Sequence, residues 1–258
     1  MFQTSVLASG SKGNCIFVRS RDTGIIIDAG ISLKRIWTAL NDLGVSRDII
    51  KAILVSHEHS DHTRSAGALA RSLKIPLYIT ADTYEFCSHR LGKVHERLQY
   101  FETGVDFHVG DILVQPFQSS HDAVDPCNFR LEHDDRSLGI ALDLGYYSRL
   151  TTMKLSRINT LILESNHDLQ MLMDGPYDWN LKMRVKSEHG HLSNDQAVGL
   201  LSQILHPGLK NIILAHLSET NNLPEIASQV MSEYLHSVRS DISLYMADQH
   251  RHTQLLDV

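Results

Sequence analysis

The most informative stretch of the sequence is Ser56-His57-Glu58-His59-Ser60-Asp61-His62. It follows an apolar run at 51–56 that is typical of a buried strand. Its side chains therefore stand on a loop at the carboxyl end of a strand, where α/β active sites lie. His57 and His59 are two apart in extended backbone and point the same way, so they can share one metal ion. Asp61 and His62 then offer a carboxylate and an imidazole to a second ion, a donor set that suits zinc, manganese or iron.

Two metal ions need more ligands, and three further residues stand at the ends of predicted strands. His121 follows a strand at 111–118, Asp143 ends a strand at 137–143, and His216 follows a strand at 211–215. Taken singly, a polar residue at a strand end is as often a turn former. The chain also holds 16 histidines, so an accidental cluster on a surface loop is the alternative reading. Together with the loop, the three residues form a coherent set of ligands.

Helical and β-rich stretches alternate along the chain. We expect strands at residues 2–8, 15–19, 24–28, 51–56, 76–80, 111–118, 127–132, 137–143, 160–164 and 211–215, with further strands at the end. We expect helices at residues 32–43, 66–73, from Asp82 onward, 193–205 and 224–236. Ser32 is a good N-cap, Asp82 is followed by Glu85, and Ser193 and Gln196 form a capping box. The order predicts an αββα sandwich of two mixed sheets flanked by helices, with two similar halves, in a single domain over 1–258.

The bulk composition narrows the class of protein. The net charge of -6 argues against a broad electrostatic grip on nucleic acid, although two bound divalent cations would make the cleft locally positive. No run approaches the roughly 18 apolar residues of a membrane span, and the amino terminus does not read as a signal peptide. Three widely spaced cysteines are typical of reduced thiols. These features predict a cytoplasmic protein that does not associate with membranes.

The loop resembles the signature of the metallo-β-lactamase superfamily, and the other candidates extend the resemblance along the chain. Asp28 is similar to the structural aspartate that braces the metal loop in that superfamily. The resemblance implies that one metal is held by three of the candidates and a second by three others, with Asp143 bridging the two ions. The implied ligands are His57, His59 and His121 for one metal, and Asp61, His62 and His216 for the other. The best-known secreted β-lactamases have cysteine at the position of Asp143, so an antibiotic-degrading activity is not expected.

A narrower resemblance is to the YycJ/WalJ group, whose members are similar to 5′-to-3′ DNA exonucleases. It rests on the stretches LASGSKGNC at 7–15, ESNHD at 164–168, GHLSN at 190–194 and HLS at 216–218, with two asparagines at 221–222. Glu164 and His191 also look like the catalytic pair of RNase Z. There Glu164 would orient His191, and His191 would protonate the leaving oxygen. With Asp61, these two residues are the candidate catalytic groups.

Phosphate contacts are a second implication of that resemblance. The backbone and side chains of Ser9, Lys12 and Asn14 would hold a substrate phosphate beside the metals. The alternative is that residues 9–14 are only the turn between the first two strands. Ser218 and Asn222 are likewise either phosphate contacts or residues at the entry to a helix.

The motif predicts a dinuclear metal-dependent hydrolase, and the resemblance implies a phosphodiesterase acting on nucleic acid, DNA rather than RNA, as a 5′-to-3′ exonuclease on duplexes. A metal ion lowers the pKa of bound water to about 7, which provides a nucleophile at neutral pH. Zn²⁺ and Mn²⁺ are the expected ions. One alternative is a small-molecule hydrolase for a thioester, lactone or cyclic phosphate, which the acidic net charge favours. Another is a metal-bound regulatory partner without turnover. Oligomeric state is left open.

Overall fold

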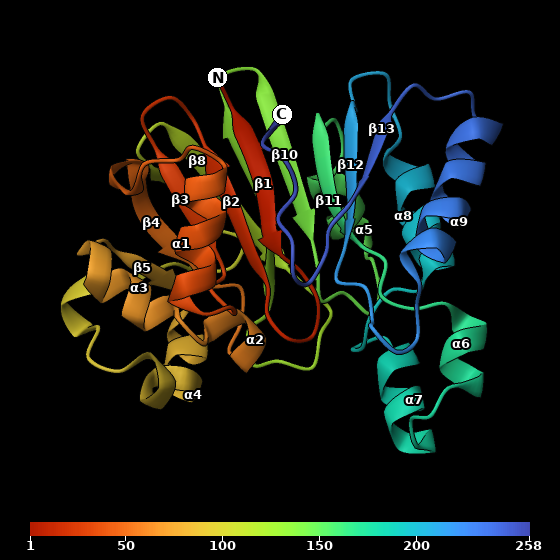
Figure 1. Ribbon diagram of the computed structural model, residues 1–258, viewed down its shortest axis with the longest axis horizontal. Helices are drawn as coiled ribbons and strands as arrows, with labels where there is room; N and C mark the ends of the chain where they lie inside the picture. Colours follow the sequence, from red (N-terminus) through yellow and green to blue (C-terminus); the bar gives the residue numbers. More distant parts are fainter.

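The computed structural model describes residues 1–258, which form two seven-stranded sheets packed face to face with helices on both outer faces (Figure 1). The first sheet has, in spatial order, β14 (Leu256–Asp257), β1 (Gln3–Ala8), β2 (Cys15–Arg19), β3 (Gly24–Ile27), β4 (Ile50–Leu54), β5 (Leu77–Ile79) and β6 (Leu98–Tyr100). The second has, in spatial order, β13 (Ser243–Met246), β12 (Asn211–Ala215), β11 (Thr160–Glu164), β10 (Arg136–Ala141), β9 (Cys127–His133), β8 (Ile112–Gln118) and β7 (Phe107–Val109). This is the predicted αββα sandwich.

The two sheets repeat one pairing pattern. In the first, β14, β1, β2 and β3 pair antiparallel, and β3 to β6 continue in parallel. In the second, β7 to β10 pair antiparallel, and β10 to β13 continue in parallel. The prediction of two similar halves is therefore confirmed. The carboxyl-terminal strand β14 takes the place in the first half that β7 takes in the second.

Nine α-helices and two 3₁₀ turns connect the strands. They are α1 (Leu33–Asp42), α2 (Ser60–Thr63), α3 (Ala66–Leu73), α4 (Ala81–Leu91), α5 (Arg149–Lys154), α6 (Leu169–Asp174), α7 (Trp179–Lys186), α8 (Asn194–Ile204) and α9 (Pro224–Ser237), with η1 (Arg47–Ile49) and η2 (His95–Arg97). Helices α1, α3 and α4 cover the first sheet, and α5, α8 and α9 cover the second (Figure 1). None of the helices combines the length and apolarity that a membrane span requires.

Three apolar cores hold the four layers together, because side chains of a strand alternate between its two faces. In β3, Ile25 and Ile27 point into the core between the sheets, and Ile26 points into the core beneath α1 and α3. In β11, Ile162 faces the other sheet, whereas Leu161 and Leu163 face the helices. Strands covered on both faces must be apolar on both, which explains the continuous apolar runs in the sequence.

Helix boundaries show where local signals succeed and where they fail. Ser32 caps α1, and Ser193 and Gln196 form the capping box of α8, as predicted. The predicted start at Asp82 is wrong: α4 begins at Ala81, and Thr80 caps it by accepting a hydrogen bond from the backbone N–H of Thr83. Strand β5 ends at Ile79, directly before this cap, so the helix begins as soon as the strand ends. Five short elements were not predicted from the sequence: α5, α6, α7, β6 and β7.

Candidate metal centre and catalytic pair

The histidine motif follows β4, and its residues Ser60 to His62 form the start of α2, which is labelled in Figure 1. Its shape is fixed by Asp28, which follows β3. One Asp28 oxygen accepts a hydrogen bond from the backbone N–H of Ser56 (2.9 Å). The other accepts from the Ser56 hydroxyl (2.8 Å) and lies 2.7 Å from His62 Nδ1. A carboxylate on one ring nitrogen fixes the orientation of an imidazole, so Nε2 of His62 is turned toward the cluster.

Two glycines allow the amino-terminal loops to close on this motif. A Cβ on Gly30 would lie 1.5 Å from the backbone oxygen of Asp61, so no side chain fits there. Gly13 has φ of +146° and is packed against the backbone of Gly30. The neighbouring Asn14 donates its backbone N–H to the Asp61 carbonyl (2.8 Å). The glycine-rich turn is thus part of the wall that supports the metal loop.

The second sheet contributes residues one at a time from separate strand ends: His121 after β8, Asp143 after β10, Glu164 at the end of β11 and His216 after β12. Asp143 and His216 have positive φ angles (49° and 56°), as does Asp28 in the first sheet (58°). Non-glycine residues rarely adopt this backbone conformation, and such strain concentrates at functional sites.

All seven predicted ligands meet in one buried cluster. Candidate ligand atoms lie within 4.8 Å of one another in one group of His57, His59 and His121 and in another of Asp61, His62 and His216. Asp143 lies between the groups: its Oδ2 is 3.1 Å from His62 Nε2, and its Oδ1 is 3.7 Å from His121 Nε2 and 3.6 Å from His216 Nε2.

Unpaired donors and shifted pKa values show that the cluster suits divalent cations. His216 Nε2 is buried and makes no hydrogen bond, although buried polar atoms nearly always have a partner. Burial and the adjacent His62 hold the pKa of His57 well below its ordinary value. Burial also disfavours charge on His62 and His216, but nearby carboxylates outweigh it and raise both pKa values, that of His216 to about 9. The carboxylates that favour positive charge on these two imidazoles would also favour a bound cation, and imidazole and carboxylate are ligands that Zn²⁺ and Mn²⁺ prefer, so the residues fit such ions.

Glu164 joins the cluster to His191. Its Oε1 lies 2.8 Å from Nδ1 of His191 and 2.8 Å from Nδ1 of His216, and its Oε2 accepts backbone hydrogen bonds from Leu144 and Leu192. The carboxylate is fully buried, which opposes ionisation, but the two imidazoles outweigh burial and lower its pKa to about 2. The His191 side chain is 20% exposed, so it faces solvent from beside the buried cluster.

The candidate phosphate contacts divide into two kinds. Ser9, Asn14 and Asn222 are buried and use their polar atoms inside the protein: the Ser9 hydroxyl accepts the His216 backbone N–H, and Asn222 bonds to Asn194. Lys12 and Ser218 lie at the surface, and Lys12 pairs with Glu219 at 2.5 Å. The turn reading of residues 9–14 therefore has structural support in the contacts of Ser9 and Asn14.

Glu58 is a residue of the site to which the sequence assigned no role. Its buried carboxylate accepts the backbone N–H of Val124 (3.0 Å), and its carbonyl accepts a hydrogen bond from Arg90 of α4 (3.1 Å). It thereby ties the histidine loop to the segment that carries His121. Only its place inside the motif could have drawn attention to it.

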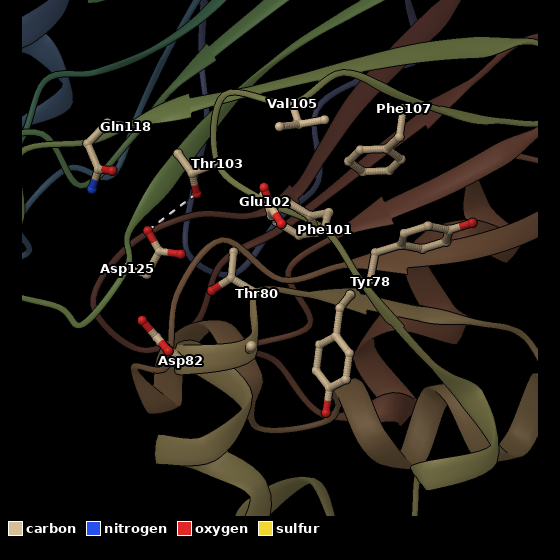
Figure 2. A pocket seen from close by; sticks show the side chains of 12 residues that line it. Tyr78, Thr80, Asp82, Phe101, Glu102, Thr103, Val105, Phe107, Gln118 and Asp125 are labelled. Carbon is tan, nitrogen blue, oxygen red and sulfur yellow. Dashed lines mark hydrogen bonds between the residues drawn. The ribbon is translucent and has the colours of Figure 1, made fainter.

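The hollows of the surface differ in chemistry. A hollow of about 170 Å³ adjoins the cluster and is lined by His191, His216, Ser218 and Arg184, among others. A larger one, about 710 Å³, lies away from these residues between β5, β6 and β7. Figure 2 shows its aromatic wall and its carboxylates, with Thr103 hydrogen-bonded to Asp125. It contains none of the predicted ligands.

Comparison with known proteins agrees with this geometry. Residues 23–216 match the model of the β-lactamase superfamily domain. Exodeoxyribonuclease WalJ of Streptococcus pneumoniae serotype 2 is 37% identical over 91% of this chain and 88% of its own length. Exodeoxyribonuclease YycJ of Bacillus anthracis is 35% identical over 90% and 88%. The metallo-β-lactamase fold protein YhfI of Bacillus subtilis superposes with a TM-score of 0.73 over 98% of this chain and all of its own, at 14% identity, which is a likeness of fold. The chain belongs to the β-lactamase superfamily and, within it, to the family of WalJ and YycJ.

Proposed function

We propose that this chain is a dinuclear metal-dependent phosphodiesterase that removes nucleotides from the 5′ end of double-stranded DNA. The observation that carries the proposal is the placement of the Glu164–His191 pair beside a cluster with two groups of metal ligands. The two relatives described above, which align with most of the chain, are named exodeoxyribonucleases, and this supports DNA as the substrate.

Each residue has a role that follows from its position. We assign His57, His59 and His121 to one ion, Asp61, His62 and His216 to the other, and Asp143 to both. When bound, two such ions supply an activated water at neutral pH and balance the charge of the phosphodiester. Zn²⁺ and Mn²⁺ both suit the donors.

The catalytic pair would serve the leaving group. Glu164 lies 2.8 Å from Nδ1 of His191 and fixes the orientation of that imidazole. Nε2 of His191 makes no hydrogen bond within the chain and is free to give a proton to the departing sugar oxygen. A sugar alkoxide is a poor leaving group, so a positioned acid matters more here than in thioester hydrolysis, in which the leaving thiolate is less basic.

The test is hydrolysis of a 5′-phosphorylated, 3′-labelled DNA duplex with Mn²⁺ or Zn²⁺, comparing wild type with His59→Ala. We expect stepwise loss from the 5′ end in wild type only. A panel of thioesters, lactones and cyclic phosphates runs beside it, because the net charge of -6 favours a small-molecule substrate. Turnover of a panel member by a protein that holds metal but leaves DNA intact would refute the nuclease proposal.

We also propose a cytoplasmic location. It is supported by three cysteines that are all buried and free of disulfides.

A further inference from the structure

A basic hollow lies on the outer side of the first half, between the end of α3, the end of α4 and η2. Its volume is about 600 Å³, and none of the residues that line it is hydrophobic. They are Arg71, Lys74, Lys93, His95, Glu96 and Arg97. Four permanent cations thus surround one hollow, with one carboxylate among them. The chain as a whole carries a net charge of -6, so this concentration runs against its overall composition.

The cations of the hollow are not neutralised by the protein. Elsewhere in the chain, Arg130 pairs with Glu132 and Arg184 with Asp122. None of the four cations in the hollow forms an ion pair with a carboxylate. Clustered like charges repel one another and destabilise the compact state. Such a cluster is therefore better suited to a polyanionic ligand than to stability.

Two of the four cations are held in place. Arg71 donates from Nη1 to the carbonyl of Leu91 (2.6 Å), and Arg97 donates from Nη1 to the carbonyl of Lys74 (3.2 Å). These contacts fix each guanidinium without cancelling its charge. Binding an anion then costs less side-chain entropy than it would with free side chains.

The hollow adjoins the metal loop through the end of α4. Arg90 donates to the carbonyl of Glu58, inside the histidine motif, and the next carbonyl along the helix, that of Leu91, accepts from Arg71. Both contacts lie at the carboxyl end of α4, so they link the hollow to the histidine motif through two neighbouring residues. One turn of a DNA duplex spans about 34 Å, so a duplex with its end at the cluster extends far enough to contact a neighbouring surface such as the hollow.

We propose that the basic hollow binds the phosphate backbone of the duplex several base pairs inside the end that is cleaved. The proposal rests on the proposed nuclease function and adds to it a docking surface outside the metal centre. It also explains how an acidic protein holds a polyanion: the contact is local. The hollow of Figure 2, with Asp82, Glu102 and Asp125 on its wall, repels phosphate and leaves the basic hollow as the surface for the duplex in this half.

The test uses the variant Lys74→Gln/Lys93→Gln, because both lysines are exposed and neither side chain braces the backbone. The matched control is Lys34→Gln/Lys210→Gln, which removes the same charge from exposed positions elsewhere. Binding of a fluorescent duplex with phosphorothioate linkages, which block hydrolysis, is measured by anisotropy over a range of salt with metal-loaded protein. Each phosphate contact contributes about 0.9 to the slope of log affinity against log salt. We expect the slope to fall by nearly 2 and the affinity to drop about ten-fold at about 0.1 M salt.

Activity separates this proposal from the nuclease proposal. With a cleavable duplex, the hollow variant should raise KM and leave kcat unchanged, and its hydrolysis of bis(p-nitrophenyl) phosphate should equal wild type. A salt slope and duplex affinity equal to those of the control variant would overturn the docking proposal, whether or not DNA is cleaved. Inorganic phosphate at equal total charge is added as a competitor. If it displaces the duplex completely, the hollow is a small-anion site, and this outcome would also overturn the proposal. Absence of DNA cleavage by wild type would overturn only the nuclease proposal.

Discussion

The first sheet supplies its cluster residues from six consecutive positions, His57 to His62, whereas the second supplies His121, Asp143, Glu164 and His216 from four separate strand ends. The loop is braced by a buried carboxylate on one histidine, Asp28 on His62. The second sheet braces two histidines with one carboxylate, Glu164 on His191 and His216. One half therefore carries a motif that is local in sequence, and the other carries a network that exists only when its strands are side by side.

The largest expected effect comes from a variant in the second half, and it tests whether Asp143 contributes to the binding of both ions. Asp143→Asn keeps the size of the side chain, and Asn tolerates the positive φ, but the amide loses the charge that faces both ligand groups. We expect less than one bound metal per chain and a loss of turnover of about a thousand-fold or more. His59→Ala, in the first half, removes a ligand from one group only and should keep about one metal. Metal analysis after gel filtration checks this, and equal metal loss in the two variants would contradict the assignment of Asp143 to both ions.

The second prediction separates metal binding from proton transfer within the second half. His191→Ala should lower kcat by about 10²- to 10⁴-fold while metal content stays at the wild-type value. His189→Ala, which changes an exposed histidine two positions away, is the matched control and should behave as wild type. Metal loss in His191→Ala would instead make His191 a ligand.

The smallest expected effect concerns stability of the metal-free protein in acid. The pKa of Glu164 falls from an ordinary value of 4.5 to about 2 in the folded state, because His191 and His216 outweigh burial. A carboxyl group with a lowered folded-state pKa stabilises the fold fully above its ordinary pKa, and this contribution is lost as the pH falls toward 2. We expect up to about 3 kcal/mol of unfolding free energy to disappear across that range.

Glu164→Gln should lack this acid-dependent loss, whereas Glu225→Gln, an exposed change on α9, should retain it. Urea unfolding between pH 2 and pH 5 gives the measurement. Parallel acid profiles for Glu164→Gln and wild type would show that the carboxylate of the second half does not stabilise the network.

Prediction from sequence succeeded where the signal was local. Apolar runs in β3, β4, β11 and β12 marked the buried strands, and the capping box at Ser193 marked the start of α8. The prediction of the N-cap of α4 failed because two residues that can cap a helix, Thr80 and Asp82, stand within three positions of each other. The end of β5 decided between them, and that end is set by pairing with β4 and β6.

The sequence by itself determined that candidate ligand residues follow strands and that four of them stand in one short motif, because spacing along a strand fixes the face on which a side chain lies. Only the tertiary structure decided that His121, Asp143 and His216 meet this loop, since residues far apart in sequence come together only through the order of the strands. It likewise decided that Glu164 holds two histidines and that Glu58 ties two loops together. The positive φ angles of Asp28, Asp143 and His216 and the close backbone approach at Gly30 are likewise imposed by packing of the whole sandwich and not by local propensity.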